Sequence, residues 1–99
     1  MREIKRYVVA EPGGSKTIAL TGRFSQTLDA LIAAGDRGIT ALDIAHWAVR
    51  LSHYIYILRK KHGLTIEMLE EEHGGEFPGR HGRYTLKTPC QPNLGEWAA

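Results

Sequence analysis

The sequence predicts an α+β fold in which three helices precede a C-terminal β-hairpin, with a possible extra strand or hairpin at the N-terminus. Apolar residues recur with helical spacing between residues 24 and 62. Apolar and polar residues then alternate in two short stretches separated by a glycine-rich segment, as expected for paired strands. The chain has 99 residues, of which 42% are hydrophobic, so it is long enough for one domain and too short for two.

Residues 1–23 are predicted to form an N-terminal arm or hairpin. The stretches 7–10 and 17–20 contain the β-branched and aromatic side chains typical of strands, and they flank the turn-forming segment 11–15. Two interpretations remain open, a hairpin or a single strand with a mobile arm.

The first helix is predicted over residues 24–34. One face of this helix carries Phe24, Leu28, Leu31 and Ile32. Ser25 is suited to cap the start of the helix, and Gly35 is suited to end it.

A short second helix is predicted over residues 41–47, after a turn at residues 36–38. Thr40 and Asp43 have the spacing of a capping box, in which each side chain bonds to the other residue's backbone N–H. Ile39 is placed to pack back onto Ile44, which would fix the direction in which the chain enters the helix.

The third helix is predicted over residues 50–62, where Leu51, Ile55, Leu58 and His62 form a buried stripe. Gly63 ends the helix. Residues 50–62 contain four basic residues and no acidic residue, whereas residues 63–79 contain five acidic residues and no basic one. The charge of the chain is therefore divided into bands, and the strongest positive band falls on the third helix.

The hairpin is predicted from the alternating stretches 64–70 and 83–87, with residues 73–82 as its loop. Its inward side chains, Ile66, Met68, Tyr84 and Leu86, would cover the open side of a small helical core. We expect the glutamates of the first strand to point away from the third helix. Residues 89–99 contain Pro89 and Pro92 and are predicted to form an irregular tail, from which Trp97 can pack back on the domain.

This order of elements over residues 24–88 is that of a winged helix-turn-helix domain. Three segments also resemble small bacterial and phage-associated winged-helix proteins: GITAL at 38–42, IYILRKKHG at 55–63, and the hairpin pair IE at 66–67 and GRYTL at 82–86. The resemblance implies binding of double-stranded DNA by a transcriptional regulator or phage-type accessory factor that works as a dimer.

In this fold the third helix would enter the major groove while the hairpin loop meets the DNA backbone. Cations would contact phosphates, and polar or apolar side chains on the exposed helix face would contact base edges. The predicted DNA-binding residues are Arg50, Ser52, His53, Tyr56, Ile57, Lys60, Lys61, Arg80, His81 and Arg83. Arg59 is a further candidate phosphate contact, although the basic residues at the helix end also complement the helix dipole.

A protein-interaction module with the same fold is the alternative hypothesis. Tyr56 and Ile57 lie side by side on the exposed helix face, as they would in a protein interface or a homodimer contact. The acidic first strand of the hairpin would repel DNA and would suit a protein partner.

The remaining motifs argue against other classes of function. Cys90 is the only cysteine, which excludes an intrachain disulfide and a multi-thiolate zinc site. The five histidines lack the spacing of metal ligands on a helix, and no pattern of catalytic residues stands out. We therefore expect no enzyme activity, metal, cofactor or small-molecule substrate. No segment is apolar enough for a membrane span or a signal peptide, so we expect a cytoplasmic protein.

Overall fold

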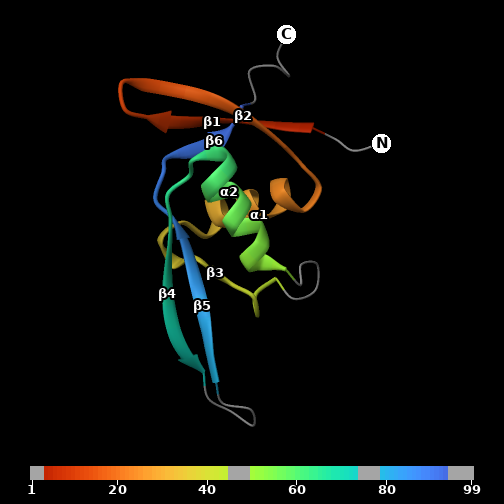
Figure 1. Ribbon diagram of the computed structural model, residues 1–99, viewed down its shortest axis with the longest axis vertical. Helices are drawn as coiled ribbons and strands as arrows, with labels where there is room; N and C mark the ends of the chain where they lie inside the picture. The colour runs from red at the N-terminus through yellow and green to blue at the C-terminus, as the bar shows by residue number, and fades with distance from the viewer. Residues whose placement is uncertain (1–3, 45–49, 74–78, 94–99) are drawn as a thin grey trace.

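Two small antiparallel sheets lie at opposite ends of the molecule, with two helices between them (Figure 1). The computed structural model describes residues 4–44, 50–73 and 79–93, and for residues 73 and 79–81 it describes the backbone alone. The first sheet has the order β2-β1-β6 and contains β1 (Ile4–Glu11), β2 (Gly14–Thr21) and β6 (Cys90–Pro92). The second has the order β3-β5-β4 and contains β3 (Ile39–Thr40), β5 (Gly79–Leu86) and β4 (Ile66–His73).

The N-terminal segment forms a hairpin, so the first of the two open interpretations is confirmed. Strands β1 and β2 pair from Ile4 opposite Thr21 to Glu11 opposite Gly14, which leaves Pro12 and Gly13 as a two-residue turn. Alternate side chains of the hairpin are buried and form one wall of the core, as expected for a sheet covered on one face. These buried residues are Tyr7, Val9, Ile18 and Leu20.

Strand β6 lies on the other side of β1 and corrects the prediction of an irregular C-terminal tail. Val9 pairs with Cys90, and Tyr7 pairs with Pro92. Proline is tolerated at position 92 because Tyr7 and Pro92 are a non-hydrogen-bonded pair of an edge strand, so no bond to β1 is lost. Trp97 lies outside the described residues.

Helix α1 spans Gly22–Ala34 and begins earlier than the sequence predicts. Leu28 and Leu31 are buried, and Gly35 ends the helix with its N–H bonded to the Leu31 carbonyl, as predicted. The prediction that Ser25 caps the helix is wrong, because Ser25 lies one turn inside the helix and its side chain is directed into a buried polar cluster.

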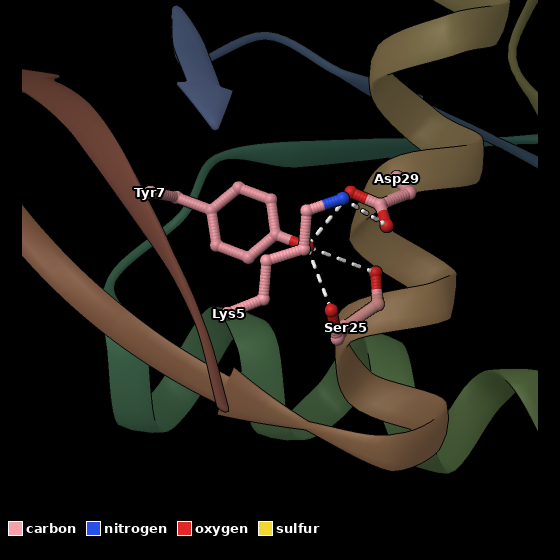
Figure 2. Close-up of polar contacts among 4 residues, drawn as sticks. All are labelled: Lys5, Tyr7, Ser25 and Asp29. Atoms are coloured by element: carbon pink, nitrogen blue, oxygen red, sulfur yellow. Dashed lines mark hydrogen bonds and ion pairs between the residues drawn. The ribbon is translucent and has the colours of Figure 1, made fainter. Parts of the chain in front are cut away.

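That cluster joins the N-terminal hairpin to α1 (Figure 2). The Tyr7 hydroxyl donates to Asp29 Oδ1 over 2.7 Å, and it lies 2.8 Å from Ser25 Oγ. Lys5 Nζ forms an ion pair with Asp29 Oδ2 at 2.9 Å. Burial of the ring raises the pKa of Tyr7 far above its usual value, and the neighbouring Asp29 adds to the rise.

The second predicted helix is not present in the described part of its range. Ile39–Thr40 form β3 against β5, a 3-10 helix η1 (Gly35–Arg37) precedes them, and residues 41–44 form turns. The capping box itself is confirmed, since Thr40 N–H donates to Asp43 Oδ2 and Asp43 N–H donates to Thr40 Oγ1, over 3.0 and 3.3 Å. The described residues therefore contain two α-helices instead of three, and residues 45–47 of the prediction lie outside them.

Helix α2 spans Leu51–His62 and matches the third predicted helix. Leu51, Ile55 and Leu58 are buried in the core between the two sheets. Gly63 has a left-handed backbone (φ 69°) and closes the helix, with the Gly63 and Leu64 N–H groups bonded to the Arg59 and Leu58 carbonyls.

Strands β4 and β5 form the wing and are longer than predicted. Pairing runs from Ile66 opposite Leu86 to His73 opposite Gly79, so the loop is shorter than residues 73–82. Ile66 is buried, and Tyr84 and Leu86 pack against the core. Met68 was predicted to do the same, but it is 52% exposed because the wing extends beyond the helices, and its side chain lies over Gly82.

Candidate nucleic-acid interface

The outward face of α2 carries a stripe of exposed residues opposite the buried Leu51, Ile55 and Leu58. Ser52, Tyr56 and Lys60 follow one another at intervals of four residues, and all three are exposed. Tyr56 is 56% exposed, which is unusual for a large aromatic side chain in the absence of a partner. The structure thus brings together three of the predicted DNA-binding residues on one surface.

His53 and Ile57 lie at the border of this stripe and are half-buried. The His53 ring centroid is 6.3 Å from that of Phe24 at the start of α1, and 6.0 Å from that of Tyr54. Phe24 and Tyr54 meet edge to face at 5.4 Å. This aromatic cluster fixes the position of α2 on α1, so His53 has a packing role in addition to the base contact predicted for it.

Arg50 stands at the N-terminal end of α2, where its side chain is exposed and its carbonyl accepts the N–H groups of His53 and Tyr54. At the other end Lys60 and Lys61 are exposed, but the Arg59 guanidinium donates through both Nε and Nη2 to the Ile66 carbonyl of β4. Arg59 therefore ties the helix end to the wing, a role that the charge pattern alone does not reveal.

Lys16 of β2 is a basic residue of this surface that the sequence analysis does not identify. Its Nζ donates to the His62 carbonyl over 2.8 Å, at the end of α2. Burial lowers the pKa of the His62 imidazole, and the positive charges of Lys61 and Lys16 lower it further. No sequence signal points to Lys16, because its proximity to α2 depends on how the hairpin packs.

The wing brings basic and acidic residues into opposite positions. Arg80 pairs in register with Glu72, and His81 pairs with Glu71. The Arg83 side chain bonds to Glu71 Oε2 through Nε at 2.7 Å and to the Arg37 carbonyl through Nη1 at 3.1 Å. The hydrogen bond and charge of Glu71 raise the pKa of Arg83 above its usual value.

The glutamates are divided between the two faces of β4. Because side chains alternate along a strand, Glu70 and Glu72 share the face of the buried Ile66, whereas Glu67 and Glu71 lie on the opposite face. The glutamates therefore do not share one face of β4, and their orientation relative to α2 stays a prediction. Residues 66–86 contain five acidic and two basic residues, so the wing as a whole is negatively charged.

The predicted residues also fall into two groups along the molecule. Lys60 and Lys61 lie at the end of α2 next to the sheet β2-β1-β6, while the wing projects from the other end (Figure 1). Arg50 lies at the α2 end that points in the direction of the wing tip. The structure therefore does not bring the two lysines close to the backbone of Arg80 and His81.

The described residues contain no cluster of metal ligands and no membrane-spanning helix. No three His, Cys, Asp or Glu side chains among them come together as a set of metal ligands. Neither helix in the described part of the chain has the length and apolar character that crossing a bilayer would need.

Comparison with known families decides the classification. A family model described as a winged helix domain matches residues 17–95. The chain belongs to the winged helix domain family. The matched range includes both helices, the wing, β6 and most of β2. No curated protein matches the chain. No solved structure matches it either.

Proposed function

We propose that this winged helix domain binds double-stranded DNA through the outward face of α2. The observation that carries the proposal is the exposed stripe Ser52–Tyr56–Lys60 on a helix region with four basic residues and no acidic residue. Serine hydroxyls bond to base edges, and an aromatic side chain can contact a thymine methyl group in the major groove. Lysine neutralises phosphates and supplies the part of the affinity that depends on salt.

The remaining predicted residues have supporting parts in this proposal. Arg50 and Lys61 contact phosphates at the two ends of the helix, and His53 and Ile57 line the border of the contact. Arg80 and His81 contact the DNA backbone from the wing, against the repulsion of the glutamates opposite them. Arg83 holds the wing in place through Glu71 and the Arg37 carbonyl.

The biological role proposed is that of a transcriptional regulator or phage-type accessory factor with no catalytic activity. A helix of twelve residues contacts only a few base pairs, so we propose a homodimer that binds two half-sites.

A binding titration of the purified protein with duplex DNA, at two salt concentrations, tests the proposal. We expect measurable affinity at low salt that falls steeply as salt rises. Lys60→Gln should weaken binding to all sequences, whereas Tyr56→Ala should change the preference between sequences. Arg37→Gln is the matched control, because it removes one exposed cation from η1 on the other side of the wing. No detectable affinity of the wild-type protein at low salt would refute DNA binding.

The second candidate function is protein binding, and three exposed apolar side chains favour it. Tyr56, Met68 and Leu69 are 56%, 52% and 66% exposed, respectively, and the last two stand on opposite faces of an acidic strand. Apolar contacts do not weaken with salt, so association through them would persist at high salt. Sedimentation at low and high salt, with and without duplex DNA, separates the two candidates. A protein complex that survives high salt and binds no DNA at low salt is expected only for the protein interface.

A further inference from the structure

The N-terminal hairpin meets the end of α2 through a basic side chain, that of Lys16. Lys16 Nζ lies 2.8 Å from the His62 carbonyl, and a Cβ placed on Gly63 would lie 3.2 Å from the same nitrogen. The hairpin therefore holds an ammonium group directly against the last turn of the helix. An ammonium has three N–H donors, and the carbonyl uses one of them.

Lys60 and Lys61 are exposed on the same last turn, so three ammonium groups lie at this end of α2. Burial is the main cause of the lowered pKa of the His62 imidazole, and the nearby positive charges of Lys61 and Lys16 lower it further. Glu11, at the turn of the hairpin, lines an open depression together with Lys16 and Gly63.

The wing is the element that would ordinarily flank the recognition helix on the DNA backbone, and here it is acidic overall. The basic hairpin flanks α2 at the opposite end from the wing tip (Figure 1). Phosphates are negatively charged and therefore complement the three ammonium groups. A lysine side chain whose position is already fixed loses less conformational entropy on binding than a mobile one.

We propose that the N-terminal hairpin is a second phosphate-binding element, in which Lys16 contacts the DNA backbone beside Lys60 and Lys61. The proposal rests on the proposed DNA-binding function and extends it to a strand that precedes the helical region. The DNA backbone then lies beside the sheet β2-β1-β6. The hairpin contacts the phosphates there, whereas the acidic wing would repel them.

The salt dependence of DNA affinity tests this proposal with the full chain and a mixed-sequence duplex. Each phosphate contact contributes about 0.9 to the slope of log affinity against log salt. Lys16→Gln should therefore reduce the slope by about 1 and weaken binding about fivefold at physiological salt. Lys16→Arg should restore the wild-type slope, and Arg37→Gln should leave it unchanged.

Three outcomes separate the two proposals. If wild-type protein binds, Lys16→Gln loses slope as Lys60→Gln does, and Lys16→Arg keeps the wild-type slope, the hairpin contact is supported. If Lys60→Gln reduces the slope while Lys16→Gln retains the wild-type value, the hairpin contact is refuted and α2 binding stands. If wild-type protein does not bind at low salt, the function itself fails. Circular dichroism of Lys16→Gln checks that a loss of slope does not come from unfolding of α2.

Discussion

A single buried hydroxyl connects the N-terminal hairpin to α1. Tyr7 is fully buried, and its hydroxyl bonds to Asp29 and to Ser25 (Figure 2). A buried polar group that lacks a hydrogen-bond partner lowers the free energy of unfolding by about 1–3 kcal/mol. Removal of the Tyr7 hydroxyl would leave Ser25 and one Asp29 oxygen with fewer hydrogen bonds.

We expect Tyr7→Phe to lower the free energy of unfolding by about 1–3 kcal/mol, because the ring stays packed and the hydrogen bonds are lost. Urea denaturation at neutral pH measures the change. Tyr56→Phe is the matched control, since the Tyr56 side chain is exposed, and it should leave the unfolding free energy unchanged. Equal effects of the two substitutions would contradict a stabilising role of the Tyr7 hydroxyl.

The Cys90 thiol should react slowly with thiol reagents. Burial raises its pKa from 9.0 to about 11, and the negative charge of Asp29 adds to the rise. At pH 8 the reactive thiolate is then about a hundredfold scarcer than in the unfolded chain. The rate of modification in buffer, compared with that in denaturant, measures this difference, and similar rates would show that the thiol is accessible and normally acidic.

The raised pKa of Cys90 also predicts that the protein becomes less stable at alkaline pH. A folded pKa above the unfolded value means that the stabilisation is present below about pH 9 and is lost as the pH rises toward 11. Tyr7 acts in the same direction at still higher pH. The urea midpoint should therefore fall between pH 8 and pH 11, and Cys90→Ala should reduce the fall.

At the scale of elements, β3 is held against β5 by the absence of a side chain at Gly38. The backbone there has φ 71°, and a Cβ would lie 2.5 Å from the Tyr84 carbonyl oxygen and 2.8 Å from Thr85 Oγ1. Because the backbone of Gly38 can lie this close to β5, Ile39 pairs with Tyr84. Residues 39 and 40 therefore form a strand, although Thr40 also belongs to the capping box.

We expect Gly38→Ala to destabilise the protein by about 3 kcal/mol or more, from a strained backbone and a backbone clash together. Gly14→Ala provides the comparison, because no atom lies within 4 Å of its Cβ position. Thermal unfolding of both variants measures the effect. A Gly38→Ala protein as stable as Gly14→Ala would mean that β3 can move away from β5 at little cost.

The backbone N–H of Gln91 is the part of β6 whose pairing with β1 can be tested by substitution. Ala10 N–H donates to the Pro89 carbonyl and Asn93 N–H to the Arg6 carbonyl, so antiparallel pairing makes Val8 and Gln91 the hydrogen-bonded pair between them. Gln91→Pro should remove a ladder donor and cost about 3 kcal/mol, whereas Gln91→Ala keeps the donor and should be close to neutral. Denaturant midpoints of the two variants compare these costs, and equal midpoints would contradict the pairing.

Local patterns predicted the elements that are stabilised locally. Helix α2 follows from its apolar stripe and Gly63, and the N-terminal hairpin follows from two β-rich stretches around a proline-glycine turn. The patterns do not reveal pairing between distant segments, so β6 on β1 and β3 on β5 were missed. At the candidate site the exposed face of α2 was predictable from the sequence. The hydrogen bonds from Arg59 to the Ile66 carbonyl and from Lys16 to the His62 carbonyl were not, because they depend on tertiary packing.

At the scale of the whole molecule, positive and negative charge are separated along the long axis. The basic end of α2 lies near the sheet β2-β1-β6, and the acidic strand β4 runs out into the wing (Figure 1). A DNA duplex placed along α2 would therefore be attracted at one end and repelled at the other, with both effects weakened by salt.

We expect Glu67→Gln to strengthen DNA binding about two- to threefold at low salt, because one repulsive charge is removed from the wing. Glu67 is exposed, and its nearest ion-pair partner, Lys87, is 3.9 Å away, so the substitution should not affect the fold. Affinities at low and high salt measure the effect, which should vanish at high salt. Unchanged binding by Glu67→Gln at low salt would contradict a repulsive contact between this side chain and the DNA.

The pairing of β6 with β1 has a consequence for the order of folding during synthesis. Strand β1 is translated before both helices and the wing, whereas its neighbour β6 is translated after them. Until then one edge of β1 carries unpaired backbone groups, which makes the nascent chain prone to wrong associations. The hairpin partner β2 follows β1 directly, so this sheet stays two-stranded until the helices and the wing have been translated and β6 is added.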